Sequence, residues 1–208
     1  MMRVDPAGCR AEDLAAARDW LRAGYVVAYP TDTFYGLAVD PTNTAAVQAL
    51  FDLKGRDPRV AMPLIAASMA QVRAIAGRLN DPSSRLARAA WPGPLSLVLD
   101  ASPAVATEVH AGRGTIAIRI PAHRVACALA EAFDGAITAT SANVSGEPPV
   151  SSADALGVIG RDPRVLVVDG GATPGGTPST IVDARGDAPV LIRDGAIAWN
   201  RVLDWLKR

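Results

Sequence analysis

The sequence predicts an α/β protein in which helices pack on a mixed parallel and antiparallel sheet. Segments typical of strands outnumber those with helical spacing, and the connections between them vary in length, unlike those of a regular βαβ repeat. The chain has 208 residues, of which 50% are hydrophobic, so it is long enough to bury a core. Because no repeat, low-complexity tract or linker divides it, we expect one domain over residues 1–208.

The first half of the chain begins with an amphipathic pattern that predicts a helix ending at Gly24, a residue type favoured at helix C-caps. A Thr-Asp-Thr turn then separates two apolar segments. We expect Thr44 to cap the next helix and Gly55 to end it. In order, the expected elements are a helix over 11–23, a strand over 25–29, an apolar segment over 35–39, a helix over 45–54 and a strand over 63–67.

The second half is richer in strands. The sequence WPGP at 91–94 breaks a helix, and GRGTIA at 112–117 fits a hairpin turn that leads into a strand. In order, the expected elements are a helix over 82–90, strands over 95–100 and 115–120, a helix over 124–133, strands over 136–140, 165–169, 179–184 and 189–193, and an amphipathic helix near 196–206.

The composition argues against some kinds of binding partner, among them nucleic acids and membranes. Acidic and basic residues balance at 21 each, so no overall field draws the protein to nucleic acid or to an acidic membrane surface. Cys9 and Cys127 lie outside any metal or redox spacing, as in proteins of a reducing cytosol. The N-terminus lacks the apolar core of a signal peptide, and no apolar run approaches the ~20 residues of a membrane span. We therefore expect a soluble, cytoplasmic protein with no membrane partner.

The signatures of covalent and metal-dependent enzymes are missing from the sequence. GRGTIA has the glycines of a dinucleotide fingerprint, but a strand pattern follows it where a helix is needed. The glycine-rich stretch 170–180 lacks the Lys of a P-loop. His110 and His123 have no other ligand types at metal spacing, and the sequence contains no G-x-S-x-G elbow. We expect no metal site formed by the protein alone.

Four polar clusters remain, each at the end of an expected strand or helix. Taken singly, each has an ordinary structural explanation as a turn or as a Lys that stabilises a helix C-terminus. As a set, however, the four clusters are harder to explain as ordinary structural features. The clusters are Thr31, Asp32 and Thr33; Lys54 and Arg56; Ser141 and Asn143; and Ser179, Thr180 and Arg193 beyond the glycine-rich stretch.

Six motifs occur in order: PTDTFYGL, KGR…MPL, WPGPLSLVL, IAIRIP, TATSANVSG and PSTIVDA…LIRDGAI. This ordered set closely resembles the YrdC/Sua5 family, the threonylcarbamoyl-AMP synthases, from about residue 11 to 198. The resemblance implies a twisted mixed parallel and antiparallel sheet with flanking helices and a concave ligand cavity. It also implies a nucleotidyltransferase that converts L-threonine, bicarbonate and ATP, with Mg²⁺ accompanying ATP, into threonylcarbamoyl-adenylate and pyrophosphate. A downstream transferase would use the product for threonylcarbamoyladenosine modification of tRNA.

The resemblance also assigns roles to residues. An anionic carbamate must approach an anionic triphosphate, so cations and hydrogen-bond donors are needed to hold phosphate or ribose oxygens. The residues expected for catalysis and ATP binding are Lys54, Arg56, Ser141 and Asn143, with Arg193 added for ATP binding. The residues expected for threonine are Thr33, Arg119 and Ser179. The planar guanidinium of Arg119 can donate two parallel hydrogen bonds to the α-carboxylate. The hydroxyls of Thr33 and Ser179 can hydrogen-bond to the hydroxyl of the substrate.

The sequence departs from the family pattern in two respects. The segment between Arg56 and Pro63 is longer and richer in Arg than the compact family form, and the chain looks like the short form, without an extra C-terminal domain. Two alternatives stay open: a relative that makes a carbamoyl-adenylate, and a double-stranded RNA or tRNA-binding module of the same fold. Zero net charge and 5% aromatic residues favour weak or indirect RNA binding.

Overall fold

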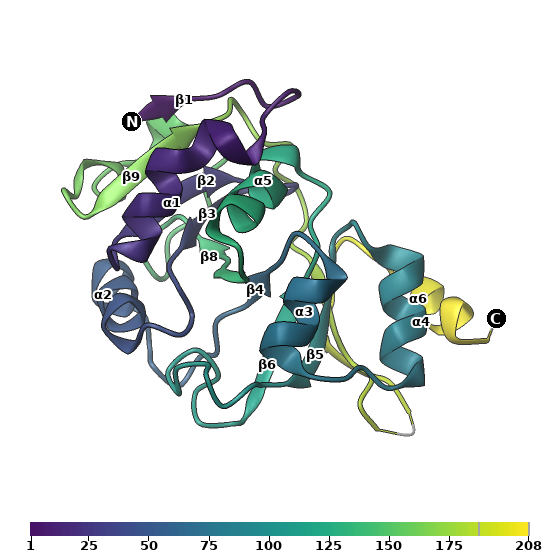
Figure 1. Cartoon of the computed structure of the whole chain (residues 1–208). Coiled ribbons are helices and arrows are strands. Elements are labelled where there is room, and N and C mark those ends of the chain that lie inside the picture. Colours follow the sequence, from purple (N-terminus) through teal and green to yellow (C-terminus); the bar gives the residue numbers. More distant parts are fainter. Residues whose placement is uncertain (187, 208) are drawn as a thin grey trace.

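The computed structural model describes residues 1–186 and 188–207 (Figure 1). Its strands are β1 (Met2–Arg3), β2 (Val26–Pro30), β3 (Tyr35–Ala38), β4 (Leu64–Ile65), β5 (Leu95–Asp100), β6 (Thr115–Arg119), β7 (Ile137–Thr138), β8 (Thr140–Ser141), β9 (Val165–Asp169), β10 (Thr180–Asp183) and β11 (Val190–Arg193). Its α-helices are α1 (Ala15–Arg22), α2 (Thr44–Lys54), α3 (Met69–Ala76), α4 (Asp81–Ala90), α5 (Arg124–Phe133) and α6 (Trp199–Lys207). Its 3₁₀ helices are η1 (Ala11–Leu14), η2 (Ala153–Leu156) and η3 (Ile159–Arg161).

The strands form two mixed sheets, which confirms the predicted mixed α/β class but divides the expected sheet in two. The strand orders are β1-β9-β2-β3-β8 and β11-β10-β5-β6-β4-β7. The strand expected over 136–140 is interrupted at Ala139, whose N–H donates to the carbonyl of Pro63 at 2.8 Å. Before the interruption β7 pairs with β4, and after it β8 pairs with β3. The chain therefore passes from one sheet to the other at this point.

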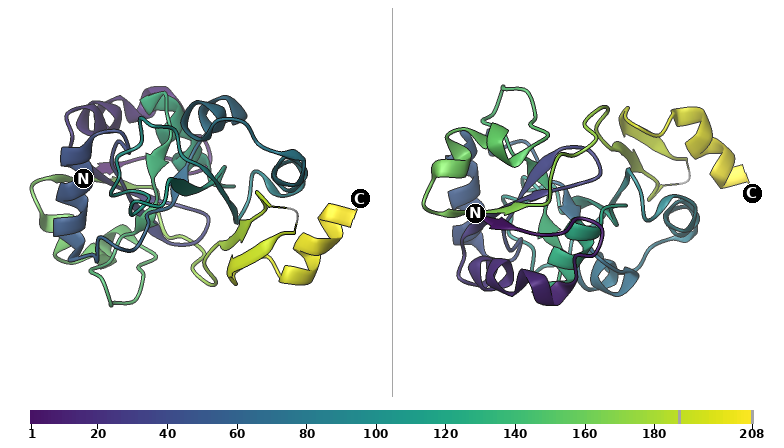
Figure 2. Two further views of the ribbon diagram at one scale, coloured as in Figure 1. Left: turned by 90° about the horizontal axis from the view of Figure 1, so that it is seen from below. Right: turned by 90° about the horizontal axis from the view of Figure 1, so that it is seen from above.

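Helices flank both sheets. α1 and α5 lie side by side and contact β2 of the first sheet (Figure 1). They do so because each presents an apolar face, on which Ala17 and Leu21 of α1 and Leu129 of α5 are fully buried. α4 contacts β5 of the second sheet, and α6 packs on α4 at the end of the molecule opposite the N-terminus (Figures 1 and 2). Within residues 1–186 and 188–207, no helix is long and apolar enough to cross a membrane.

The structure corrects two details of the expected helices. α3 was not expected, because its eight residues follow directly on the apolar segment that predicts a strand; Ser68 caps it by accepting from the N–H of Gln71 at 3.2 Å. The cap of α2 is Asn43 rather than Thr44, since the Asn43 side chain accepts from the N–H of Ala46 at 3.1 Å. The predicted end of α2 is confirmed, because Gly55 has the left-handed conformation (φ 56°) that favours glycine.

Candidate active site

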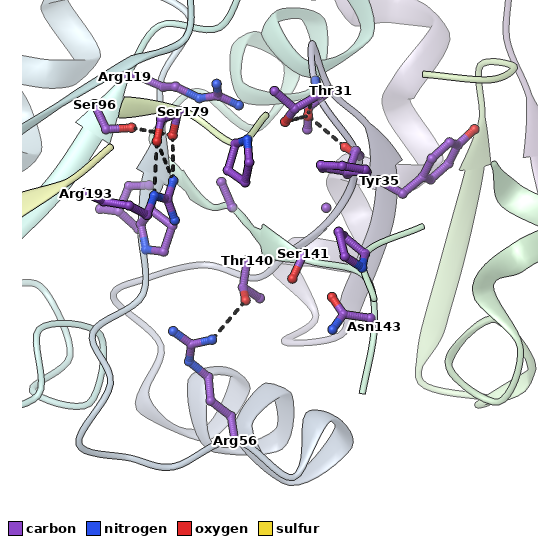
Figure 3. A pocket seen from close by; sticks show the side chains of 18 of the residues that line it. Thr31, Tyr35, Arg56, Ser96, Arg119, Thr140, Ser141, Asn143, Ser179 and Arg193 are labelled. Atoms are coloured by element: carbon purple, nitrogen blue, oxygen red, sulfur yellow. Dashed lines mark hydrogen bonds between the residues drawn. The ribbon is translucent and has the colours of Figure 1, made fainter. Parts of the chain in front are cut away.

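A cavity of about 250 Å³ is lined by residues of both sheets and by the turns that follow β2, α2 and β8 (Figure 3). Seven of the eight residues expected from the sequence line it: Thr33, Arg56, Arg119, Ser141, Asn143, Ser179 and Arg193. Lys54 is the exception. In Figure 3, Ser96, Ser179, Arg119 and Arg193 gather on one side of the cavity, and Arg56, Thr140, Ser141 and Asn143 lie on the other.

The Thr-Asp-Thr turn is built by Thr31, which belongs to the first polar cluster but is assigned no ligand from the sequence. The hydroxyl of Thr31 accepts from the N–H of Thr33 at 3.2 Å and donates to the carbonyl of Phe34 at 2.7 Å. Such hydroxyl-to-backbone bonds form a tight turn in place of strand pairing. Thr31 is thereby buried, and Thr33 is presented to the cavity.

Arg119, at the end of β6, is buried and already ion-paired. Its Nη1 donates to Oδ2 of Asp32 at 3.3 Å, and its Nη2 lies 2.8 Å from Oδ1 without the geometry of a hydrogen bond. The Arg119 side chain is 7% exposed and that of Asp32 is 11% exposed. The sequence expected Arg119 in the site; it did not indicate this carboxylate partner.

Ser179 and Arg193 form a hydrogen-bonded cluster with Ser96, which the sequence did not indicate. Arg193 donates from Nη2 to the Ser179 hydroxyl at 3.0 Å and to the Ser179 carbonyl at 2.7 Å. The hydroxyls of Ser179 and Ser96 are 3.2 Å apart. Although Arg193 as a residue is exposed, burial of its guanidinium and the nearby charge of Arg119 hold the pKa of Arg193 below its ordinary value.

The segment LIRDGAI lies on PSTIV because Gly195 permits close backbone approach. A Cβ at Gly195 would lie 2.4 Å from the carbonyl oxygen of Pro178 and 2.5 Å from the nitrogen of Thr180. The Thr180 hydroxyl accepts from the N–H of Ile197 at 2.9 Å and donates to its carbonyl at 2.7 Å. These contacts hold together the two segments that carry Ser179 and Arg193.

Lys54 lies beneath the cavity wall, which corrects the expectation that it faces the ligand. Its side chain is 1% exposed, and its Nζ donates to the carbonyls of Ser141 and Asn143. Its own carbonyl accepts from the N–H of Ser145 at 2.8 Å. Burial, with a smaller contribution from the charge of Arg56, lowers the pKa of Lys54 to about 8. One residue thus fixes the turn that carries Ser141 and Asn143.

Arg56 is held at the cavity by hydrogen bonds, two of them to the segment that follows it. It donates from Nε to the carbonyl of Val60 at 3.3 Å, from Nη2 to that of Ala61 at 2.9 Å and from Nη1 to the Thr140 hydroxyl at 3.4 Å. Burial lowers its pKa. Arg56 and Arg193 also line an adjoining groove of about 470 Å³, which runs over strand residues such as Ile181.

The Asn143 amide is oriented by two backbone carbonyls, which leaves its oxygen rather than its nitrogen available to the cavity. Its Nδ2 donates to the carbonyls of Val144 at 2.8 Å and Glu147 at 2.7 Å. Its Oδ1 is buried and has no partner within the described part of the chain. Asn143 therefore offers an acceptor to the cavity rather than a donor for a phosphate oxygen.

The glycine-rich stretch lies against the Thr-Asp-Thr turn. The N–H of Gly175 donates to the carbonyl of Thr33 at 2.7 Å, and the N–H of Thr173, whose side chain is buried, donates to the carbonyl of Ser151 at 2.8 Å. Residues 178 and 179 at its end line the cavity.

Among residues 1–186 and 188–207, no group of three or more His, Cys, Asp or Glu side chains could hold a metal ion. His110 accepts from the N–H of Gly114 at 3.2 Å, within the turn that precedes β6. Burial lowers the pKa of His123, which precedes α5. Neither histidine lines the cavity.

The sequence family described as "Telomere recombination" (Sua5_yciO_yrdC) matches residues 19–195. A "Threonylcarbamoyl-AMP synthase" from Pyrococcus abyssi is 36% identical over 186 residues, which are 89% of this chain and 55% of that relative. A protein of the same description from Thiobacillus denitrificans is 41% identical over 165 residues, covering 79% of this chain and 87% of the relative. The chain thus spans about half the length of the first relative and most of the second.

Solved structures share the fold. The structure described as P. abyssi Sua5 complexed with L-threonine has a TM-score of 0.90 and 33% identity, covering 98% of this chain and 59% of that one. E. coli YciO has a TM-score of 0.85 with 22% identity, covering 97% of this chain and 98% of that one. At that identity the second likeness concerns the fold alone.

Proposed function

The chain belongs to the Sua5/YrdC family, and from that premise we propose that it is an L-threonylcarbamoyladenylate synthase, a nucleotidyltransferase acting on L-threonine, bicarbonate and ATP. The observation that carries the proposal is the cavity, which brings seven of the eight expected residues together from six separate segments of the chain. Three of the seven are arginines, and Glu147 is the one carboxylate among the described lining residues. A site of this kind suits anionic substrates.

The chemistry requires charge and position rather than a protein nucleophile. The threonine amine condenses with bicarbonate to give a carbamate and water, and a carbamate oxygen then attacks the α-phosphate while the bond to pyrophosphate breaks. Attacking and attacked groups are both anionic, so fixed cations lower the barrier most. Arg56 and Arg193 provide such cations, each held by hydrogen bonds before any ligand arrives.

The threonine end of the cavity is proposed to be the side with Arg119, Ser179 and Thr33. After the contacts to Asp32, Arg119 keeps further N–H groups for an α-carboxylate. Ser179 and Thr33 supply hydroxyls within the same lining. The likeness to the structure of P. abyssi Sua5 complexed with L-threonine supports this choice of amino acid.

ATP needs more room than the cavity alone provides. Ligand sites usually measure roughly 300–1,000 Å³, whereas the cavity is about 250 Å³. The adjoining groove of about 470 Å³ shares Arg56 and Arg193 with the cavity. We place the phosphates at these two arginines and at the Ser141 hydroxyl, with the nucleoside extending into the groove.

Mg²⁺ is proposed to enter with ATP. The residues present fit an ion carried mainly by the phosphates, since the cavity offers one carboxylate, Glu147, and the buried, unpartnered Oδ1 of Asn143, both hard oxygen donors of the type that Mg²⁺ accepts. These two residues would hold it. The ion would neutralise charge on the phosphates.

The product is proposed to pass to a downstream threonylcarbamoyl-transferase that modifies tRNA. The balanced charge supports only weak or indirect RNA binding by this chain itself.

Pyrophosphate release from ATP tests the proposal. The purified protein should release pyrophosphate only when L-threonine and bicarbonate are both present. Equal release without threonine, or turnover that yields ADP, would overturn it. Turnover with carbamoyl phosphate in place of threonine and bicarbonate would favour the carbamoyl-adenylate alternative.

A further inference from the structure

Asp32 stands directly behind the cavity. Its carboxylate contacts Arg119, which lines the cavity, while Asp32 itself is not among the lining residues. The Thr31 hydroxyl folds the turn from both sides of Asp32, through the N–H of Thr33 and the carbonyl of Phe34. The turn and the end of β6 are therefore joined by one ion pair across 87 residues of sequence.

An arginine in this place needs such a partner to keep its geometry. The Arg119 guanidinium lies in the same cavity as that of Arg193, and like charges repel strongly where little water screens them. An arginine side chain has several rotatable bonds, and unpaired it would move away from its neighbour. A fixed, planar fork is what matches a carboxylate with two parallel hydrogen bonds.

We propose that Asp32 is a positioning residue, which holds the Arg119 guanidinium in the orientation that receives the substrate carboxylate. The inference rests on the proposed function, because the carboxylate is taken to be that of threonine. Asp32 touches no substrate in this account and acts only through Arg119.

Variants of Asp32 should have three effects that a residue needed only for folding would not show. Asp32→Asn keeps the size and one acceptor but removes the charge, so the KM for threonine should rise about tenfold. The KM for ATP should stay within about twofold, because among the described residues Asp32 has no hydrogen bond or ion pair to Arg56, Arg193 or Ser141, where the phosphates are placed. Asp32→Glu keeps the carboxylate one methylene further out, so it should restore part of the threonine affinity that Asp32→Asn loses.

The experiment is isothermal titration of the wild type and variants with L-threonine and with L-threonine amide, which lacks the carboxylate. The wild type should prefer threonine, and Asp32→Asn should lose most of that preference. In a double-mutant cycle, Asp32→Asn added to Arg119→Met should cause no further loss, since the residue through which Asp32 acts is already gone. Asp162→Asn is the matched control, because Asp162 pairs with Arg164 at 2.7 Å outside the cavity.

The outcomes are distinct. If the wild type neither binds threonine nor releases pyrophosphate in its presence, the proposed function fails. If the wild type does both but Asp32→Asn behaves as Asp162→Asn does, the positioning role is wrong. Additive losses in the cycle, or an equal rise of the KM values for ATP and threonine, would also overturn it. Thermal unfolding of each variant shows whether the protein is folded, and Asp32→Glu serves as the test variant if Asp32→Asn is not.

Discussion

Replacing Lys54 by Met tests whether this lysine organises the site from beneath. Methionine is similar in length but cannot donate, so the carbonyls of Ser141 and Asn143 lose charge-assisted hydrogen bonds worth about 1.5–3 kcal/mol each. Removing the ammonium also removes the cost of burying it. A pKa of about 8 in place of 10.5 puts that cost at about 3 kcal/mol. The two effects largely offset each other, and the net loss of unfolding free energy is about 0–3 kcal/mol.

Activity should suffer far more than stability. Lys54 makes three hydrogen bonds with the turn that presents Ser141, and the variant loses the two that the side chain donates. If the Ser141 hydroxyl is displaced by about 1 Å as a result, the rate should fall roughly 10²-fold. Pyrophosphate release and thermal unfolding measure the two effects, and hydrogen exchange of residues 141–147 should become faster. Lys207→Met is the control, because Lys207 makes an exposed ion pair with Asp204. Near wild-type turnover of Lys54→Met, with unchanged exchange in this turn, would show that Lys54 does not organise the turn.

Three further predictions concern other parts of the site. Arg119→Lys keeps the charge but loses the fork, so titration should show about tenfold weaker threonine binding, or ~1.4 kcal/mol, with ATP binding nearly unchanged; loss of ATP binding alone would reverse the assignment of the two ends. Gly195→Ala forces a Cβ against the backbone of 178–180, so it should lower both the unfolding temperature and turnover by displacing Ser179; a fully active, equally stable variant would contradict this. Because the folded protein releases the Lys54 proton near pH 8 and the unfolded chain does so near 10.5, raising the pH across this window stabilises the folded state. The difference in unfolding free energy between wild type and Lys54→Met should therefore grow by about 1 kcal/mol from pH 7 to 9, measured by denaturant titration, and a constant difference would contradict it.

The sequence predicts local structure well where a pattern is complete within one segment. The strands over 95–100 and 165–169 and the helix over 124–133 have the predicted bounds, since uniform apolar runs and helical spacing determine them locally. α3 was missed because its eight residues follow an apolar segment without an intervening breaker. The division into two sheets is not predicted because it depends on which distant strands pair, such as β7 with β4 and β8 with β3, and a local pattern does not contain this information.

In the candidate site, too, contacts between distant residues are not predicted by the sequence. Motif order brings most of the candidate residues together correctly, but it does not indicate what each side chain contacts. Lys54 and Ser141 are hydrogen-bonded although 87 residues separate them in the sequence, and Ser96 and Ser179 are separated by 83. Local residue spacing therefore cannot predict these contacts. The Asp32 side chain resembles an ordinary turn residue until Arg119 is placed beside it.

Mass spectrometry of the reaction product distinguishes the proposed synthase reaction from other uses of ATP. The purified chain is incubated with ATP, Mg²⁺, L-threonine and isotopically labelled bicarbonate. The proposed synthase should form an adenylate whose mass includes threonine and the labelled carbon, and it should release pyrophosphate in equal amount. An adenylate that lacks the label or the amino acid, or a mixture in which ATP yields only ADP, would contradict it.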